Sequence, residues 1–211
     1  MLPWGHAALG YLLYSAWRHL RTGRPPGGWA VVGLAVGTQF PDLIDKPLAW
    51  TVPVLPSGRS LAHSLVVIVP VTVAVAAAVV LIRRARRDGA PDGHTADAPA
   101  TPAVAAAGGF AFGWYAHLLG DAYRVVLPGE ACVSYLLWPV APVCGYAESD
   151  ASILGFFLEL TPTPAIVAGL ALTAVAVGVW CRDGTPGLAA VRAVAGGVAG
   201  AVAERVGNGR P

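Results

Sequence analysis

Histidine and aspartate side chains occur in this chain at spacings that suit metal ligation. His117 and Asp121 are four residues apart, so on a helix both lie on one face, roughly 5–6 Å apart. An imidazole and a carboxylate at that separation can reach one cation. Asp42 and Asp45 follow a proline and are three residues apart, which allows the same arrangement. We therefore predict a metal site to which both pairs contribute.

The wider set of candidates shares one property, which is that each member stands at the end of an apolar segment. A polar side chain in that place can simply face interfacial water, and this is the ordinary explanation for any single one. Several buried carboxylates in a chain so poor in charge are costly unless they are paired or bind a metal. The predicted metal ligands are His6, Asp42, His63, His117 and Asp121, and the predicted catalytic groups are Asp45 and Arg59.

The predicted ligand types indicate which ions the site could take. Imidazole with carboxylate suits zinc first, with manganese, iron or nickel as alternatives. No cysteine joins the set, which argues against a structural zinc finger. The candidates outnumber the ligands of one catalytic site, so we predict one or two divalent ions. His19 and His94 lie in other segments and are predicted to take no part.

Two cationic side chains, Arg59 and Lys46, accompany the predicted ligands. An arginine fork beside a metal is well suited to holding a phosphate. The alternative for Arg59 is an ion pair that neutralises Asp42 or Asp45. Both interpretations stay open from the sequence.

The composition indicates a membrane protein. The 211 residues are 55% hydrophobic and 12% charged, with a net charge of +2 and a mean hydropathy of +0.61. Soluble globular chains carry roughly 25% charged residues, so this chain lacks the polar side chains to cover a surface in water. This excludes a disordered chain, a nucleic-acid binder with a basic face, and a small secreted disulfide domain. Cys132 and Cys144 can form one disulfide or remain free apolar thiols.

The apolar segments predict an all-α, polytopic membrane helix bundle of about five spanning helices. The firmest span is 64–82, with further spans at 103–120 and 161–180 and two shorter ones at 6–17 and 29–41. The segment 131–146 is predicted as a re-entrant or interfacial element, and 187–203 as a weak interfacial or spanning helix. We expect one membrane-embedded domain over 1–182, with a cytoplasmic loop at 83–102, and a separate apolar helix and tail over 183–211.

Basic residues predict the orientation, since they favour the cytoplasmic side. With the loop at 83–102 inside, eleven basic residues lie on the cytoplasmic side and three, Lys46, Arg59 and Arg124, on the other. This places the protein in the plasma membrane as a multi-pass protein. All predicted site residues then fall on the extracytoplasmic face.

Five motifs, in this order and spacing, resemble the membrane-bound metal-dependent hydrolase family typified by YdjM, over about residues 1 to 145. The resemblance implies the same functional set of three histidines, three aspartates and Arg59. The second acid here stands three residues after the first instead of two, so whether Asp45 ligates directly or supports a ligand stays open. The motifs are WGHAALG at 4–10, PDLIDKP at 41–47, GRSLAHSL at 58–65, HLLGD at 117–121 and LLWPVAP at 136–142.

The sequence thus predicts an integral membrane metal-dependent hydrolase. A metal-activated water would attack a phosphoester of a lipid or lipid-linked substrate at the extracytoplasmic surface, with an aspartate as general base. Two alternatives are a non-catalytic membrane protein with a structural metal site and a small transporter. A transporter would be expected to keep its ionisable residues near the membrane midplane, whereas here they stand at helix ends. The sequence does not predict the oligomeric state.

Overall fold

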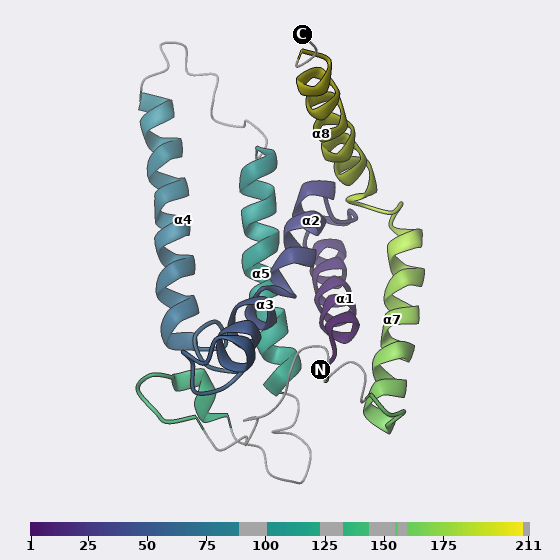
Figure 1. Ribbon diagram of the computed structural model, residues 1–211. Coiled ribbons are helices and arrows are strands. Elements are labelled where there is room, and N and C mark those ends of the chain that lie inside the picture. The colour runs from purple at the N-terminus through teal and green to yellow at the C-terminus, as the bar shows by residue number, and fades with distance from the viewer. Residues whose placement is uncertain (89–100, 123–132, 144–154, 156–159, 209–211) are drawn as a thin grey trace.

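The computed structural model describes residues 1–88, 101–122, 133–143, 155 and 160–208. In these ranges the chain is helical and contains no strand, which confirms the all-α prediction. Figure 1 shows the helices and the order in which they follow one another. They are α1 (Pro3–Thr22), α2 (Gly28–Gly37), α3 (Phe40–Lys46), η1 (Pro47–Thr51), α4 (Leu65–Asp88), α5 (Pro102–Ala122), η3 (Ser134–Leu137), α7 (Pro164–Arg182) and α8 (Leu188–Asn208).

The predicted spans overlap the observed helices, but α1 (Pro3–Thr22) extends beyond the predicted 6–17 at both ends, and 29–41 divides into α2 and the start of α3. The segment 64–82 was expected to end before its basic residues, but α4 continues to Asp88. The helix therefore enters the segment 83–102 that was predicted as a loop. The start of α7 is better defined: the hydroxyl of Thr163 accepts from the amide of Ile166, and Pro164 occupies the first turn.

The centre of the fold is the crossing of α2 and α5. Each helix carries a pair of glycines four residues apart, Gly33 with Gly37 and Gly109 with Gly113. A Cβ placed at Gly33 would lie 1.9 Å from the backbone oxygen of Ala106. The other three glycines would also meet backbone atoms at distances below 3 Å. Small residues at this spacing let helix backbones touch, and here only glycine fits.

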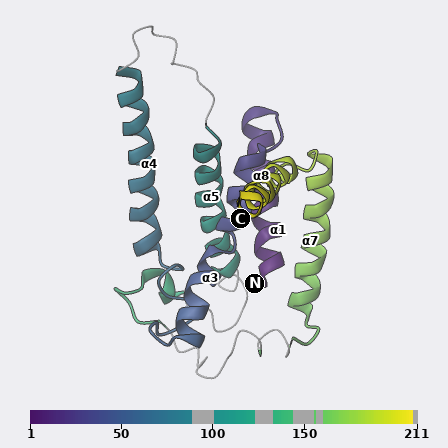
Figure 2. The same cartoon turned by 45° about the horizontal axis from the view of Figure 1, so that its top comes forward.

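The helix α1 lies between α5 and α7, as Figures 1 and 2 show from two directions. Its buried side includes His6, Ala8, Tyr11 and Ser15, and it makes contacts with both neighbours. The helix α4 stands apart from this group in both views, and only 6% of its most apolar window is buried. The bundle therefore has a compact part, made by α1, α2, α5 and α7, with α4 beside it and α8 extending beyond the end of α7.

Two helices in the described ranges are long and apolar enough to cross a membrane by length and composition, Leu65–Ala85 and Pro164–Arg182. The prediction of about five spanning helices is therefore not confirmed. The helix α2 has only 10 residues, while α1 and α5 carry ionisable residues and glycines that lower their hydropathy. In α8 only Leu188–Gly200 is apolar. The predicted domain boundary falls in the turn between α7 and α8, and a separate C-terminal domain stays a prediction.

Candidate metal centre

Four segments bring the predicted site residues to one end of the bundle. His6 comes from the first turns of α1, Asp42 and Asp45 from α3, His63 from the loop before α4, and His117 with Asp121 from the last turns of α5. The three histidines have no exposed surface. The structure therefore joins residues that are more than a hundred positions apart in the chain.

His63 and His117 face one another through their Nε2 atoms, which lie 3.1 Å apart. The other nitrogen of each ring already has an acceptor. Nδ1 of His63 lies 2.8 Å from Oδ2 of Asp45, and Nδ1 of His117 lies 2.7 Å from the backbone oxygen of Thr38. A proton on each Nδ1 satisfies these contacts and leaves a lone pair on each Nε2. Two lone pairs at this distance repel unless a positive charge lies between them.

Carboxylate oxygens of Asp42 and Asp121 complete the arrangement. Oδ1 of Asp42 lies 3.6 Å from Nε2 of His63 and 3.8 Å from Nε2 of His117. Oδ2 of Asp121 lies 3.6 and 4.0 Å from the same two atoms. Tetrahedral ligands at about 2.0–2.1 Å from an ion are separated by roughly 3.3 Å. These four side chains, named here the cage, have the chemistry of a divalent-ion site, and three of them, His63, His117 and Asp121, offer ligand atoms within 4.8 Å of one another.

His6 lies against the cage. Its ring stacks on that of His117, with 3.7 Å between centroids, and its Nε2 is 3.2 Å from Oδ1 of Asp121. His6, Asp42 and His117 also offer ligand atoms within 4.8 Å of one another. Nδ1 of His6 is buried and has no hydrogen-bond partner among the described residues. His6 is thus placed either to bind an ion as a further ligand or to hold the Asp121 carboxylate in position.

Asp45 lies beneath His63 and has no exposed surface. Its carboxylate accepts hydrogen bonds from the backbone amides of Ser60 and Ala62 at 2.8 and 2.9 Å, besides its contact with His63 Nδ1. Carboxylates that hold the second nitrogen of a ligating histidine fix the ring and its tautomer. These contacts are those of a positioning group, and a direct catalytic role for Asp45 stays a prediction.

The two cationic side chains pair with the outer carboxylates. Arg59 Nε lies 2.6 Å from Oδ2 of Asp121, and Lys46 Nζ lies 2.7 Å from Oδ2 of Asp42. The sequence allowed an ion pair of Arg59 with Asp42 or Asp45, but its observed partner is Asp121. The reason is that the loop before His63 places Arg59 beside the end of α5. Arg59 therefore reaches the cage from the side of Asp121.

The chain matches a known protein family. The model of the YdjM inner membrane protein family matches residues 1–203. This chain belongs to the YdjM inner membrane protein family. Searches of curated proteins and of solved structures found no match. Membership in the YdjM family confirms the predicted resemblance and supports a plasma-membrane location, and the match extends past the motifs to include α7 and most of α8.

Electrostatics in this YdjM family member favour one positive charge inside the cage. Burial alone would lower the pKa of His63, but Asp42, Asp45 and Asp121 outweigh it and raise that pKa. Burial alone would raise the pKa of Asp42, yet His63, Lys46 and His117 hold it well below its ordinary value. The carboxylates are thus ionised and pair with Lys46, Arg59 and the N-terminal amine of Met1, and a proton on His63 or a metal ion would add a further positive charge between the rings.

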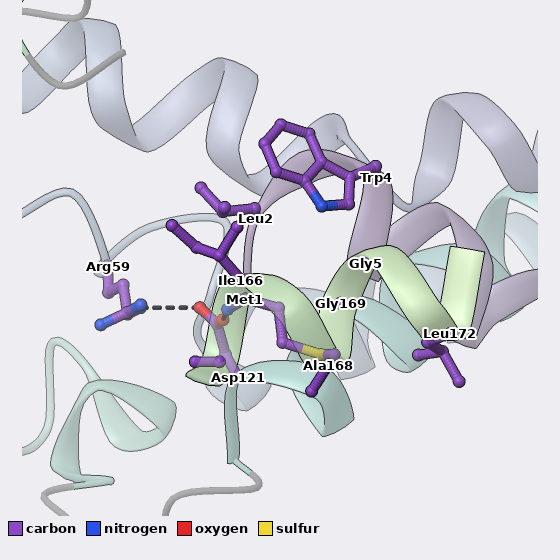
Figure 3. A pocket seen from close by; sticks show the side chains of 11 residues that line it. Met1, Leu2, Trp4, Gly5, Arg59, Asp121, Ile166, Ala168, Gly169 and Leu172 are labelled. Carbon is purple, nitrogen blue, oxygen red and sulfur yellow. Dashed lines mark hydrogen bonds and ion pairs between the residues drawn. The ribbon is translucent and has the colours of Figure 1, made fainter. Parts of the chain in front are cut away.

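A pocket of about 490 Å³ adjoins the cage. Arg59 and Asp121 line one end of it, and side chains from α1 and α7 line the rest, as Figure 3 shows. Asp121 therefore belongs to both the cage and the pocket wall. Any molecule in this pocket lies next to the predicted metal position.

Some groups at the site were not predicted from the sequence. The backbone oxygen of Thr38, at the end of α2, orients His117, and Trp114 Nε1 donates to the backbone oxygen of Ala62 beside His63. A backbone acceptor leaves no signal in the sequence. The two glycine pairs are such a signal, and the contact between α2 and α5 could have been predicted from them. Cys132, Cys144 and His94 lie outside the described residues.

Proposed function

We propose that this protein is an integral membrane metal-dependent hydrolase that cleaves a phosphoester at the extracytoplasmic membrane surface. The observation that carries the proposal is the cage: two Nε2 lone pairs 3.1 Å apart with two carboxylates beside them. A single proton can join only two of these four atoms, whereas a divalent ion can satisfy all of them. Zinc suits the two imidazole and two carboxylate ligands best.

The residues divide into those that hold the ion and those that meet the substrate. His63, His117 and Asp42 would hold it from the protein interior, while Asp121 completes the cage on the pocket side. A divalent ion there would polarise a phosphoryl oxygen and supply a nucleophilic water at neutral pH. Asp121 would accept a hydrogen bond from that water, and the Arg59 guanidinium, 22% exposed, would bind phosphate oxygens.

The membrane placement of the site is part of the proposal. The helices α4 and α7 are the two with the length and composition of spans, and we propose that α1, α2 and α5 cross with them as a packed group. In Figure 1 the site lies at the end of the bundle where α4 and α7 begin, and their basic C-terminal ends lie at the other. Basic ends on the cytoplasmic side place the site on the extracytoplasmic face.

A structural metal site is the competing function. It is favoured by the four protein side chains around the cage, because closed four-ligand sites are typical of structural zinc. The competing arrangement predicts that all four stay bound to the ion and that no substrate reaches it. The adjoining pocket, which Asp121 and Arg59 line, favours the hydrolase.

The test combines metal analysis with turnover of the purified full-length protein in detergent. We expect about one or two zinc ions per chain and hydrolysis of phosphoesters. His63→Ala and Asp42→Ala should lose both the ion and the activity.

Asp45→Asn distinguishes two roles of Asp45. If Asp45 is a positioning group, its loss weakens metal binding by roughly 10- to 100-fold. If it is a catalytic base, its loss lowers kcat and leaves metal binding unchanged. Bound metal without turnover would establish the structural site, and absence of metal would overturn both functions.

A further inference from the structure

The helices α1 and α7 enclose an apolar groove that begins at the cage. The pocket of about 490 Å³ lies at the site end and contacts α7 from Ala165 to Leu172. A second pocket of about 210 Å³ lies farther along the same two helices and contacts α7 from Thr173 to Trp180. Trp4 lines both pockets. We name these two pockets together the α1–α7 groove.

We propose that the α1–α7 groove binds the hydrocarbon chain of an amphiphilic phosphoester, whose phosphate lies at Arg59 and the cage. This inference rests on the proposed hydrolase function and adds the substrate class to it. It predicts that the preferred substrate is a long-chain lipid phosphoester and that small water-soluble phosphoesters are poor substrates.

The chemistry of the groove changes along its length in the order that an amphiphile requires. At one end stand the Arg59 guanidinium and the Asp121 carboxylate, and the remaining walls of the larger pocket are mostly apolar. Figure 3 shows Leu2, Trp4 and Ile166 on the same wall as this ion pair. A small polar ester would leave these apolar walls unfilled, whereas an acyl chain would cover them.

The length of the groove also suits a hydrocarbon chain. Residues 165 to 180 of α7 line it, and at 1.5 Å per residue this is about 22 Å. One leaflet of a bilayer has a hydrocarbon thickness of about 15 Å, half of roughly 30 Å. A lipid chain that enters beside the cage therefore has room along the full depth of its leaflet.

One buried donor points to a ligand in the groove. Trp4 Nε1 is buried and has no hydrogen-bond partner among the described residues, although a buried indole N–H usually has one. The nearest feature of α7 is Gly169, where an added Cβ would lie 3.5 Å from this nitrogen. An ester or ether oxygen near the head of a lipid chain would supply the missing acceptor.

The far end of the groove is held closed by hydrogen bonds. Asp183, directly after α7, accepts from Tyr11 and Ser15 of α1 at 2.8 and 2.6 Å. Toward the site end, a longer link joins the two helices, from Thr173 Oγ1 to the backbone oxygen of Trp4 at 3.4 Å. The larger pocket lies at the site end and the smaller one toward Asp183, so the end of the groove with room for a headgroup is the one beside the cage.

Gly169→Leu tests the groove, with Gly178→Leu as the matched control. A Cβ at Gly169 meets only Trp4, at 3.5 Å or more, so a leucine can be accommodated while it fills the groove. Gly178 lies on the same helix and has nothing within 4 Å. Both variants make the same change in helix propensity, and they differ in that Gly169 is buried and Gly178 is exposed. The zinc-loaded proteins are assayed on a long-chain phosphatidic acid in detergent and on a soluble aryl phosphate.

We expect Gly169→Leu to lower kcat/KM for the long-chain substrate, relative to the soluble one, by about tenfold or more, a change of about 1.4 kcal/mol. Gly178→Leu should leave the ratio unchanged. An unchanged ratio in Gly169→Leu, with activity present, overturns the groove and leaves the hydrolase intact.

A binding experiment keeps the groove testable without turnover. Phosphatidic acid with a photoreactive acyl chain is crosslinked to the full chain carrying Asp42→Ala, and labelled peptides are mapped. The groove predicts label on α7 between Ala165 and Trp180, reduced about tenfold by Gly169→Leu and unaffected by Gly178→Leu. Label spread equally over α4 and α7 would indicate unspecific contact with lipid and overturn the proposal. Specific label with no turnover in the parent protein would support the groove and overturn the hydrolase.

Discussion

The helix α1 carries a cluster of buried polar groups near each end, and the two clusters differ in their balance of donors and acceptors. Near its C-terminal end, the carboxylate of Asp183 accepts from Tyr11, Ser15 and His19 at 2.8, 2.6 and 2.9 Å. Every strong acceptor there has a donor. Near its N-terminal end, the cage sets ring nitrogen against ring nitrogen and surrounds both with carboxylates.

This difference identifies the functional cluster better than burial or residue type does. Both clusters contain histidine and aspartate, and both include side chains with almost no exposed surface. The Asp183 cluster is complete without any further group, so its role is to hold α7 against α1. In the cage two ring nitrogens face one another with no donor assigned between them, so it is the cluster that could hold an ion.

The largest expected effect comes from substituting one histidine in each of the two clusters. His117→Ala should abolish binding of a stoichiometric zinc ion, because it removes the residue that both groups of possible ligands share. His19→Ala is the matched control, since His19 contacts only the satisfied carboxylate of Asp183 among the described residues and is partly exposed. Metal content after gel filtration measures both. Equal zinc in the two variants would contradict the assignment of the cage.

A second substitution tests whether close helix packing sustains the cage. A Cβ at Gly109 would lie 1.9 Å from the backbone oxygen of Ala30, whereas one at Gly108 would meet nothing within 4 Å. We expect Gly109→Ala to cost about 3 kcal/mol by overpacking and to weaken zinc binding, because α5 carries His117 and Asp121. Gly108→Ala should be neutral or stabilise the helix by up to about 1 kcal/mol.

Denaturant titrations in detergent, together with zinc titrations, measure these two effects. If Gly109→Ala unfolds with the midpoint of the parent protein, α2 and α5 do not touch as described. If it is destabilised but binds zinc normally, the crossing does not position the cage.

The parts of this molecule that could be predicted from sequence are those with local signals. The i, i+4 spacing of His117 and Asp121 and the motif order were enough to name the cage residues, which the structure brings together. The number of spans could not be predicted by counting apolar segments. Counting found α1 as the short segment 6–17, but α1 buries histidine, tyrosine and serine against its neighbours, so its composition alone does not distinguish a membrane span from a packed helix.

The Asp183 cluster was missed for a different reason. His19 was predicted to take no part in the metal site, and it lies outside the cage, but its partner stands 164 positions later in the chain. No spacing rule connects such positions. The same is true of Thr38, which orients His117 through a backbone oxygen. Long-range contacts of this kind follow from the α2–α5 crossing and the α1–α7 contact, which only the fold reveals.

The smallest expected effect is a pH-dependent loss of stability when Asp183 is substituted. Burial alone would raise the pKa of Asp183, but hydrogen bonds from Ser15, His19 and Tyr11 outweigh it and lower that pKa. A carboxyl whose folded pKa is depressed stabilises the fold above its unfolded pKa, about 3.9, and loses this contribution as the pH falls through the folded value. Asp183→Asn should therefore cost about 1–3 kcal/mol at neutral pH and less below about pH 4. Unfolding titrations of the zinc-free proteins between about pH 3 and pH 7 measure the difference in unfolding free energy between the parent protein and the variant. A difference that is constant with pH would mean that Asp183 is not ionised in the folded protein. The Asp183 cluster would then be less complete than its contacts imply.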